Sequence, residues 1–263
     1  MYTKFTTLVL FLIGSSILFN LAILDFGKSG VIDHPSQEGI AVVELFTSQG
    51  CSSCPSADRL LSRIIDEAEN EGQAVYGLSF HVDFWNRLGW KDPYSQRAFT
   101  ERQYAYARQM RQQGVYTPQM VVNGRAEFVG SNRGVATSEI NKAQSKGIAK
   151  PIEVKQISAK NGKLAFEYSS PFTEGASWLN IALVERGIAT RVKRGENGGR
   201  LLKHDNVVRS FQQQDLKAGG EIEVNIPAGL DLTKSSLILY TQERSNWHID
   251  GATRVSLAQL SAN

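Results

Sequence analysis

The sequence predicts an α/β domain over residues 39–149 and a mostly β, sandwich-like domain over residues 150–263. The first part alternates apolar strands with segments whose apolar residues recur at helical spacing. The second part consists of short alternating runs separated by turn residues, which is typical of an antiparallel sandwich. The only two cysteines, Cys51 and Cys54, lie between the first predicted strand and the first predicted helix.

Composition and charge narrow the class of protein. Of the 263 residues, 41% are hydrophobic and 21% are charged, as in a folded globular protein. The net charge of +3 is small and the basic residues are scattered, so we exclude nucleic-acid binding.

The chain begins with a predicted export segment. Lys4 precedes a mostly apolar stretch over residues 5–24, and a positive end followed by an apolar segment directs export. The stretch approaches the roughly 20 residues that span a bilayer as a helix. We expect residues 1–26 to form an uncleaved membrane anchor or a cleaved signal peptide, and residues 27–38 to form a linker. Both alternatives place the cysteines in an oxidising compartment.

The elements of the first domain follow from periodicity and turn signals. The first strand is almost continuously apolar, which predicts a central strand that is buried on both faces. Asn123-Gly124 is a hairpin signal. The expected strands are 40–46, 74–82, 119–122 and 127–129. The expected helices are 56–68, one that begins between residues 93 and 98 and ends at 113, and 135–145.

The second domain is predicted from shorter signals. Its glycine-rich, basic segment 187–200 is expected to form a long hairpin or loop. The expected strands are 152–158, 164–168, 178–184, 207–211, 221–226 and 237–242.

Cys51 and Cys54 form a Cys-x-x-Cys at the amino terminus of a predicted helix, where a thioredoxin-like fold keeps its redox dithiol. The helix dipole and unpaired N–H groups at this end favour a thiolate. We expect Cys51, the more exposed of the two, to be the nucleophile and Cys54 to resolve the mixed disulfide. A permanent local disulfide or a pair of metal ligands are the alternatives.

Two further positions favour redox chemistry. In a thioredoxin-like fold, Thr117-Pro118 would be a cis peptide facing the dithiol, and the Thr117 backbone would hold a peptide substrate as an added strand. The alternative is a trans proline that starts a strand. Glu44 interrupts an apolar strand, where an unpaired carboxylate is costly. We expect Glu44 either to take the proton of Cys54 or to pair with a basic residue or solvent.

His81 ends the second predicted strand, and functional groups gather at the carboxyl ends of parallel strands. We therefore expect it near Cys51, where it would stabilise a thiolate, complete a metal site with Cys51 and Cys54, or serve as a structural residue. Trp85 is expected to line a substrate groove or to pack on the core. His204 is expected to lie far from the dithiol.

Long motifs extend over nearly all of the chain after residue 38: 43–58, 80–85, 89–93, 115–124, 194–197 and 206–209. Together they resemble a bacterial family known as domain of unknown function 1223, a group of exported thioredoxin-fold proteins. The resemblance implies a thioredoxin-like domain, a trailing β domain and export, and it implies no established substrate. It includes His81 and Trp85 in the motif, which favours a functional role for His81.

These observations predict a periplasmic thiol–disulfide oxidoreductase that acts on protein or peptide disulfides through Cys51 and Cys54, without a cofactor. Its partners would be exported protein thiols and an unidentified redox partner. One alternative is a protein that binds or delivers a soft metal such as copper through Cys51, Cys54 and His81. Another is a non-catalytic interaction protein whose β domain binds the partner.

Overall fold

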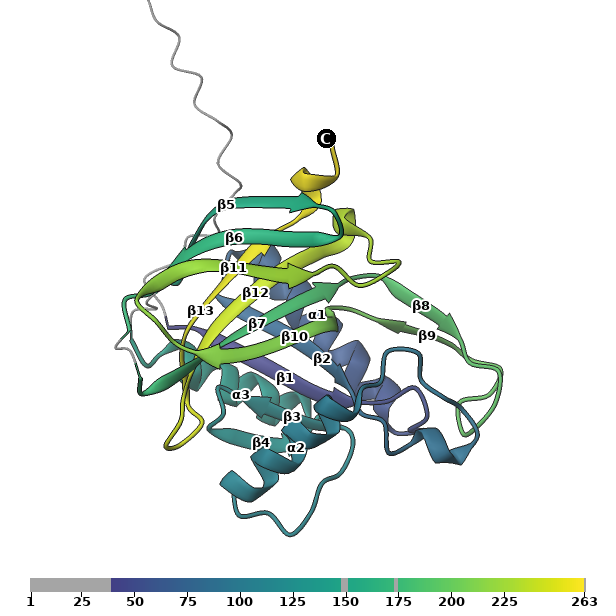
Figure 1. Cartoon of the computed structure of the whole chain (residues 1–263). Coiled ribbons are helices and arrows are strands. Elements are labelled where there is room, and N and C mark those ends of the chain that lie inside the picture. Colours follow the sequence, from purple (N-terminus) through teal and green to yellow (C-terminus); the bar gives the residue numbers. More distant parts are fainter. Residues whose placement is uncertain (1–38, 148–150, 173–174, 263) are drawn as a thin grey trace, which may run out of the picture.

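The structure is a computed structural model that describes residues 39–147, 151–172 and 175–262 (Figure 1). The strands and α-helices are β1 (Ala41–Thr47), α1 (Cys54–Glu71), β2 (Val75–His81), α2 (Arg97–Gln109), β3 (Gln119–Val122), β4 (Ala126–Val129), α3 (Arg133–Gln144), β5 (Glu153–Lys160), β6 (Lys163–Ser169), β7 (Ser177–Glu185), β8 (Ile188–Arg191), β9 (Leu201–His204), β10 (Val207–Asp215), β11 (Gly219–Asn225), β12 (Ser235–Glu243) and β13 (Ile249–Ser256). Three short 3-10 helices are η1 (Asn86–Leu88), η2 (Leu232–Lys234) and η3 (Ala258–Ala262).

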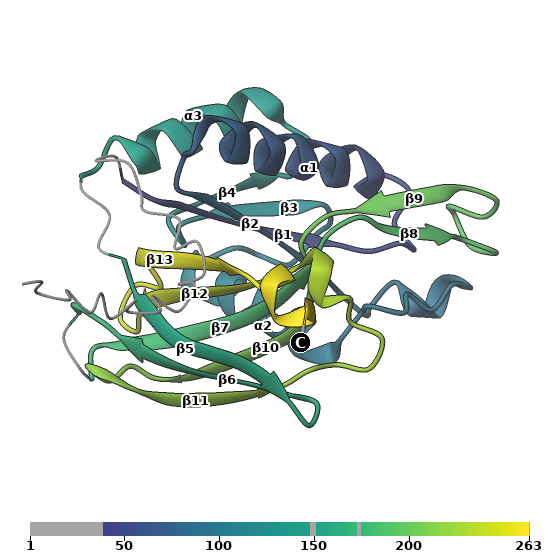
Figure 2. The same ribbon diagram turned by 90° about the horizontal axis from the view of Figure 1, so that it is seen from above.

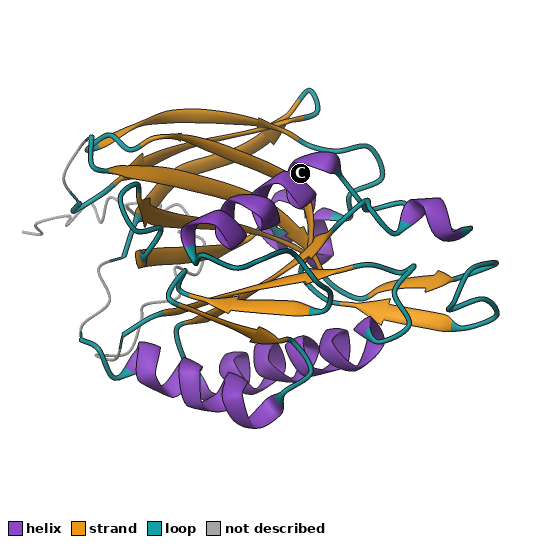
Figure 3. Ribbon diagram, turned by 90° about the horizontal axis from the view of Figure 1, so that it is seen from below, coloured by secondary structure: helices purple, strands orange, loops and turns teal. Residues whose placement is uncertain are grey.

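One mixed sheet of eight strands organises the described residues, in the order β13-β12-β7-β10-β2-β1-β3-β4. Strand β2 is parallel to both of its neighbours, β1 and β10, and the other neighbouring strands are antiparallel. A second sheet, β11-β6-β5, packs against β7, β12 and β13 through a shared apolar cluster (Figure 2). Strands β8 and β9 form a separate hairpin that projects from the main sheet (Figure 3).

The helices cover the β1–β4 end of the main sheet. Helices α1 and α3 lie together on one face (Figures 2 and 3), and α2 packs on the opposite face. Side chains of β1 alternate between these faces: Val43 and Leu45 pack in the cluster beneath α1, and Val42 and Phe46 pack in the cluster beneath α2. The predicted burial of this strand on both faces is therefore confirmed.

Local sequence signals explain several boundaries. Helix α1 has Pro55 in its first turn, where no backbone N–H is required, and it ends at Gly72, whose φ of 66° lies in the left-handed region. Asn123 and Gly124 also have positive φ angles, as a tight hairpin between β3 and β4 requires. The predicted strands and helices are all present with ends shifted by a few residues, while β9 and β13 were not predicted.

The predicted fold class, an α/β thioredoxin-like domain followed by a mostly β, sandwich-like domain, is wrong. The described residues are mostly β, with three α-helices, and strands from both halves of the chain join one sheet. The connection is made where Val207 of β10 pairs with Ser79 of β2. The Asn206 side chain also donates to the Gly77 carbonyl at 2.9 Å. Because every residue of β2 is buried, its open edge needs a partner, and the second half of the chain supplies it.

Two predicted boundaries lie outside the described residues. The anchor or signal segment at residues 1–26 and the linker at 27–38 belong to the part that the structure does not describe. The division near residue 150 falls in the undescribed segment 148–150, so it stays a prediction. No helix among the described residues has the length and apolar character needed to cross a bilayer.

Candidate functional site

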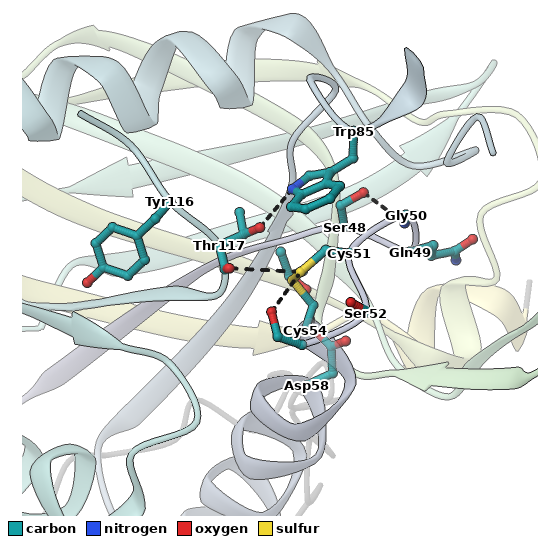
Figure 4. The surroundings of a disulfide bond; sticks show 12 residues. Ser48, Gln49, Gly50, Cys51, Ser52, Cys54, Asp58, Trp85, Tyr116 and Thr117 are labelled. Atoms are coloured by element: carbon teal, nitrogen blue, oxygen red, sulfur yellow. Dashed lines mark hydrogen bonds between the residues drawn. A yellow bond between two sulfur atoms is a disulfide. The ribbon is translucent and has the colours of Figure 1, made fainter. Parts of the chain in front are cut away.

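Cys51 and Cys54 form a disulfide where the loop after β1 enters α1 (Figure 4). Both cysteines are 0% exposed, so the expectation that Cys51 is the more exposed of the two is wrong. Ser52 and Ser53 between them are exposed. The Ser53 hydroxyl lies 3.4 Å from the Cys51 sulfur and can donate a hydrogen bond to it. The bond therefore lies directly beneath the surface rather than deep in the core.

The side of the disulfide away from α1 is lined by Thr117 and Trp85. The peptide bond between Thr117 and Pro118 is cis, as the sequence predicted. The Thr117 carbonyl oxygen lies 3.9 Å from the Cys51 sulfur. The Trp85 indole Nε1 donates to the Thr117 hydroxyl at 2.8 Å, which holds the half-buried indole beside the disulfide (Figure 4). The structure thus brings together Cys51, Cys54, Thr117, Pro118 and Trp85.

The loop between β8 and β9 fixes the other side of the cysteine loop. The Asn197 side chain, which is buried, donates to the carbonyls of Gln49 and Cys51 at 3.0 and 2.8 Å. The Glu196 carboxylate accepts from the Ser52 backbone N–H at 3.1 Å. A negative charge at this helix terminus occupies a donor that could otherwise stabilise a Cys51 thiolate. The segment predicted as a hairpin or loop therefore belongs to the site.

Asp92 connects His81 to the loop that carries the cysteines. The His81 Nδ1 is 2.7 Å from the Asp92 carboxylate, which also accepts from the Gln49 backbone N–H at 2.8 Å. Burial lowers the pKa of His81, but the negative charge of Asp92 and the hydrogen bond to it raise the pKa above its usual value. Burial in turn raises the pKa of Asp92, and His81 brings it below its usual value. This ion pair holds the loop before Cys51 in place.

A second buried acid and a second histidine lie below the disulfide. Asp58 is on α1, one turn after Cys54, and accepts a hydrogen bond from the Thr47 hydroxyl at 2.8 Å. The Nδ1 of His204 on β9 lies 3.5 Å from the other Asp58 oxygen. The His204 ring is 4.8 Å from the His81 ring, centroid to centroid. His204 therefore lies within the site and not far from it, contrary to the prediction.

Glu44 lies on the other face of the sheet from α1. Its carboxylate accepts from the Arg102 Nε at 2.9 Å, from the Tyr240 hydroxyl at 2.6 Å and from the Tyr106 hydroxyl. The side chains of Glu44 and Arg102 are 1% and 5% exposed. Burial raises the pKa of both tyrosine hydroxyls, which keeps them as neutral donors. Glu44 is therefore paired with a basic residue, Arg102, which was one of the alternatives that the sequence left open. The ion pair is buried and does not lie at a strand edge.

The described residues contain no group of three or more His, Cys, Asp and Glu side chains arranged to hold a metal ion. His81 directs Nδ1 to Asp92, and the two cysteine sulfurs are joined to each other. The alternative of a Cys51, Cys54 and His81 metal site therefore has no geometric support.

Sequence reasoning missed Asp58, Asp92, Asn197 and His204. Asp58 had a usable signal, because its spacing of four from Cys54 places both side chains on one face of a helix. The other three lie 38 or more residues from the cysteines in sequence and meet them only through tertiary contacts.

Comparisons with known proteins give a family and one informative structural relative. A family model described as "Protein of unknown function (DUF1223)" matches residues 42–242. The crystal structure of a protein from Agrobacterium tumefaciens is 30% identical, with a TM-score of 0.62, over 84% of this chain and 96% of that chain. No curated protein gives a significant match.

Two other solved structures are similar only at a low level. A domain of the outer membrane lipoprotein Omp28 from Porphyromonas gingivalis is 11% identical, over 40% of this chain and 92% of that chain, with a TM-score of 0.25. OgpA from Akkermansia muciniphila is 12% identical, over 44% of this chain and 33% of that chain, also with a TM-score of 0.25. Neither similarity supports an inference about this chain.

Proposed function

The chain belongs to the DUF1223 family, whose function is not known, and we propose that it is an exported thiol–disulfide oxidoreductase that acts on protein or peptide substrates through Cys51 and Cys54. Export is proposed from the positive and apolar pattern of residues 1–26. In the bacterial periplasm its partners would be exported protein thiols and a second redox protein that recharges the pair.

The observation that supports this proposal best is the position of the disulfide. It joins cysteines three residues apart, and such a short loop constrains the unfolded chain least, so stabilisation is a weak reason for the bond. It lies instead at a helix amino terminus, where unpaired N–H groups and the helix dipole stabilise a thiolate leaving group or nucleophile. The exposed Ser53 hydroxyl adds a donor to the Cys51 sulfur.

In the proposed reaction a substrate thiolate attacks the Cys51 sulfur, and the electron pair of the broken bond passes to Cys54. The Trp85 indole would first swing away, which breaks its hydrogen bond to Thr117 and part of its packing against the core and Phe84. Displacement of Trp85 opens a path along Thr117, whose backbone would then hold an extended substrate beside Cys51. A second substrate thiolate attacks the substrate sulfur of the mixed disulfide, releasing a substrate disulfide and the reduced protein. The reverse sequence reduces a substrate disulfide.

A trapping experiment tests this proposal. The Cys54→Ala variant leaves Cys51 without its resolving partner, so mixed disulfides should accumulate and migrate as adducts on non-reducing gels. Cys51→Ala is the matched control, since it keeps one cysteine in the same loop and should trap far less. A redox titration of the wild-type pair should give a potential above about −300 mV, because structural disulfides lie below that value. Absence of any adduct, together with a lower potential, would show that the bond is structural.

A further inference from the structure

We propose that Asp58 and His204 form the proton acceptor and donor of Cys54, a role that rests on the proposed function and that the sequence suggested for Glu44. Asp58 lies on the Cys54 side of the disulfide, away from the Trp85 side where a substrate would enter (Figure 4), and His204 lies against Asp58. Cys54 requires a nearby proton donor because its side chain is 0% exposed, and a buried thiolate is costly unless a proton reaches it quickly.

Asp58 is positioned by the helix and by β1. It follows Cys54 by four residues on α1, a spacing that puts the two Cβ atoms about 5–6 Å apart on the same helix face. Figure 4 shows the Asp58 carboxylate among the side chains around the disulfide. The Thr47 hydroxyl holds one carboxylate oxygen, and Asp58 is only 4% exposed. The second oxygen remains for His204, 3.5 Å away.

His204 extends the site inward. It is 0% exposed, and within the described residues neither of its ring nitrogens has a hydrogen-bond partner at normal distance. The Nε2 of the neighbouring His81 has none either. Buried polar atoms are nearly always paired, so two adjacent imidazoles with free nitrogens need an explanation. An imidazole that must both gain and lose a proton during turnover provides one.

The charges around Asp58 come from each element that packs there. His204 approaches from β9 and His81 from β2, and His81 is held in turn by Asp92. Two described carboxylates bond to the cysteine loop from outside: Asp92 at the Gln49 N–H and Glu196 at the exposed Ser52 N–H. Two acids, Asp58 and Asp92, and two histidines, His81 and His204, therefore lie in one buried cluster.

The proton movements balance with the sulfur chemistry. When the disulfide is reduced, the Cys51–Cys54 bond breaks, the Cys54 sulfur leaves as a thiolate, and it takes a proton from the Asp58–His204 pair. In the opposite direction the pair removes the proton of the Cys54 thiol. The resulting thiolate attacks the Cys51 sulfur of a mixed disulfide and expels the substrate thiolate.

Glu44 is excluded from this role by its position. It lies on the face of β1 that carries Val42 and Phe46, whereas α1 packs on the face of Val43 and Leu45. Its two oxygens already accept from one guanidinium and two hydroxyls.

The experiment follows the two steps of reaction with oxidised glutathione separately. Reduced protein is mixed with oxidised glutathione from pH 5 to 9, and quenched samples are weighed by mass spectrometry for the mixed disulfide and the final disulfide. In Asp58→Asn the mixed disulfide should form at the wild-type rate but resolve about 100-fold more slowly at pH 7, the lower end for a positioned acid or base. The deficit should narrow as pH rises towards 9, because hydroxide then increasingly removes the thiol proton in place of the missing carboxylate. His204→Gln should shift the profile in the same direction.

The matched control is Asp66→Asn, which removes a 57% exposed carboxylate from the same helix. It should retain the wild-type pH profile of the resolving step. If wild type forms no mixed disulfide at all, the proposed function fails. If wild type forms and resolves it, but Asp58→Asn and His204→Gln keep the same rate and pH profile, the redox function stands and the proton role of this pair is refuted.

Discussion

Replacing Glu44 by Gln tests whether this acid serves the fold or the dithiol. The substitution keeps the shape of the side chain and removes its charge. Arg102 then remains buried without a carboxylate, surrounded by the rings of Phe80, Phe211 and Trp247. Those rings contribute favourable cation–π contacts, but neither they nor the neutral amide oxygen of glutamine replaces the negative charge that faces the guanidinium.

The expected loss follows from this geometry. Removing one partner of a buried, hydrogen-bonded ion pair costs about 3–5 kcal/mol, because the other charge stays buried and unpaired. For a chain of this size each kcal/mol lowers the melting temperature by about 2–4 °C, so Glu44→Gln should lower it by about 6–20 °C. The double variant with Arg102→Met should lose little more than either single variant, since the two charges act as one unit.

Urea and thermal unfolding followed by circular dichroism would measure these losses. The matched control is Asp250→Asn, which breaks an exposed pair with Arg125 whose N···O distance is also 2.8 Å. That loss should be at most about 1 kcal/mol. The redox potential of the cysteine pair should be unchanged in Glu44→Gln. A loss as small as the control, or a large shift of the potential, would refute the assignment of Glu44 to the core.

Three further predictions concern the surroundings of the disulfide. Trp85→Phe removes the N–H that bonds to Thr117, and that hydrogen bond is worth about 0.5–1.5 kcal/mol. Reduction of the disulfide by dithiothreitol should therefore be roughly 2–12-fold faster in stopped-flow measurements. An unchanged rate would mean that Trp85 does not limit access to the disulfide. Glu196→Gln removes a negative charge from the helix terminus, which should stabilise the Cys51 thiolate by about 0.3–1 kcal/mol. The measured redox potential should then be roughly 6–20 mV more positive, and a negative shift would contradict this role of Glu196. His81 has a raised pKa, so its ion pair stabilises the fold fully below about pH 6.5, and this contribution is lost as pH rises through the pKa of folded His81. Asp92 has a lowered pKa, so its contribution is present above about pH 4 and is lost as pH falls through the pKa of folded Asp92. The stability difference between wild type and Asp92→Asn in urea should therefore be largest between these limits and should narrow at alkaline pH, and a difference that does not vary with pH would contradict the ion pair.

Local sequence determined the elements and part of the site. The apolar run of residues 40–46 was sufficient to predict a strand buried on both faces, and Asn123-Gly124 was sufficient to predict the hairpin. The two cysteines and Thr117-Pro118 were expected to meet by analogy with thioredoxin-like folds, and the Cys51 sulfur does lie 3.9 Å from the Thr117 carbonyl oxygen. The strand and hairpin signals depend on residues close together in the chain.

Partners from distant parts of the chain could not be predicted in this way. The open edge of β2 can be filled by any strand, and only the packed structure shows that β10 fills it, which joins strands from both halves of the chain in one sheet. The same contact brings β9 across α1 and places His204 against Asp58. Glu44 was recognised as a buried acid, but its partner Arg102 lies 58 residues away on a helix whose rotation the sequence does not specify.

The sequence by itself therefore determined that this chain has a Cys-x-x-Cys at a helix terminus, since local propensity and spacing encode that feature, whereas the cis-proline beside it was expected by analogy with thioredoxin-like folds. Only the tertiary structure decided which acid lies on the side of Cys54 and what covers Cys51. The two candidate acids, Glu44 and Asp58, are both buried, and the face of the sheet toward which each points separates them. That choice depends on how strands from both halves of the chain pack, and the free energy of packing is shared among residues that are far apart in the sequence.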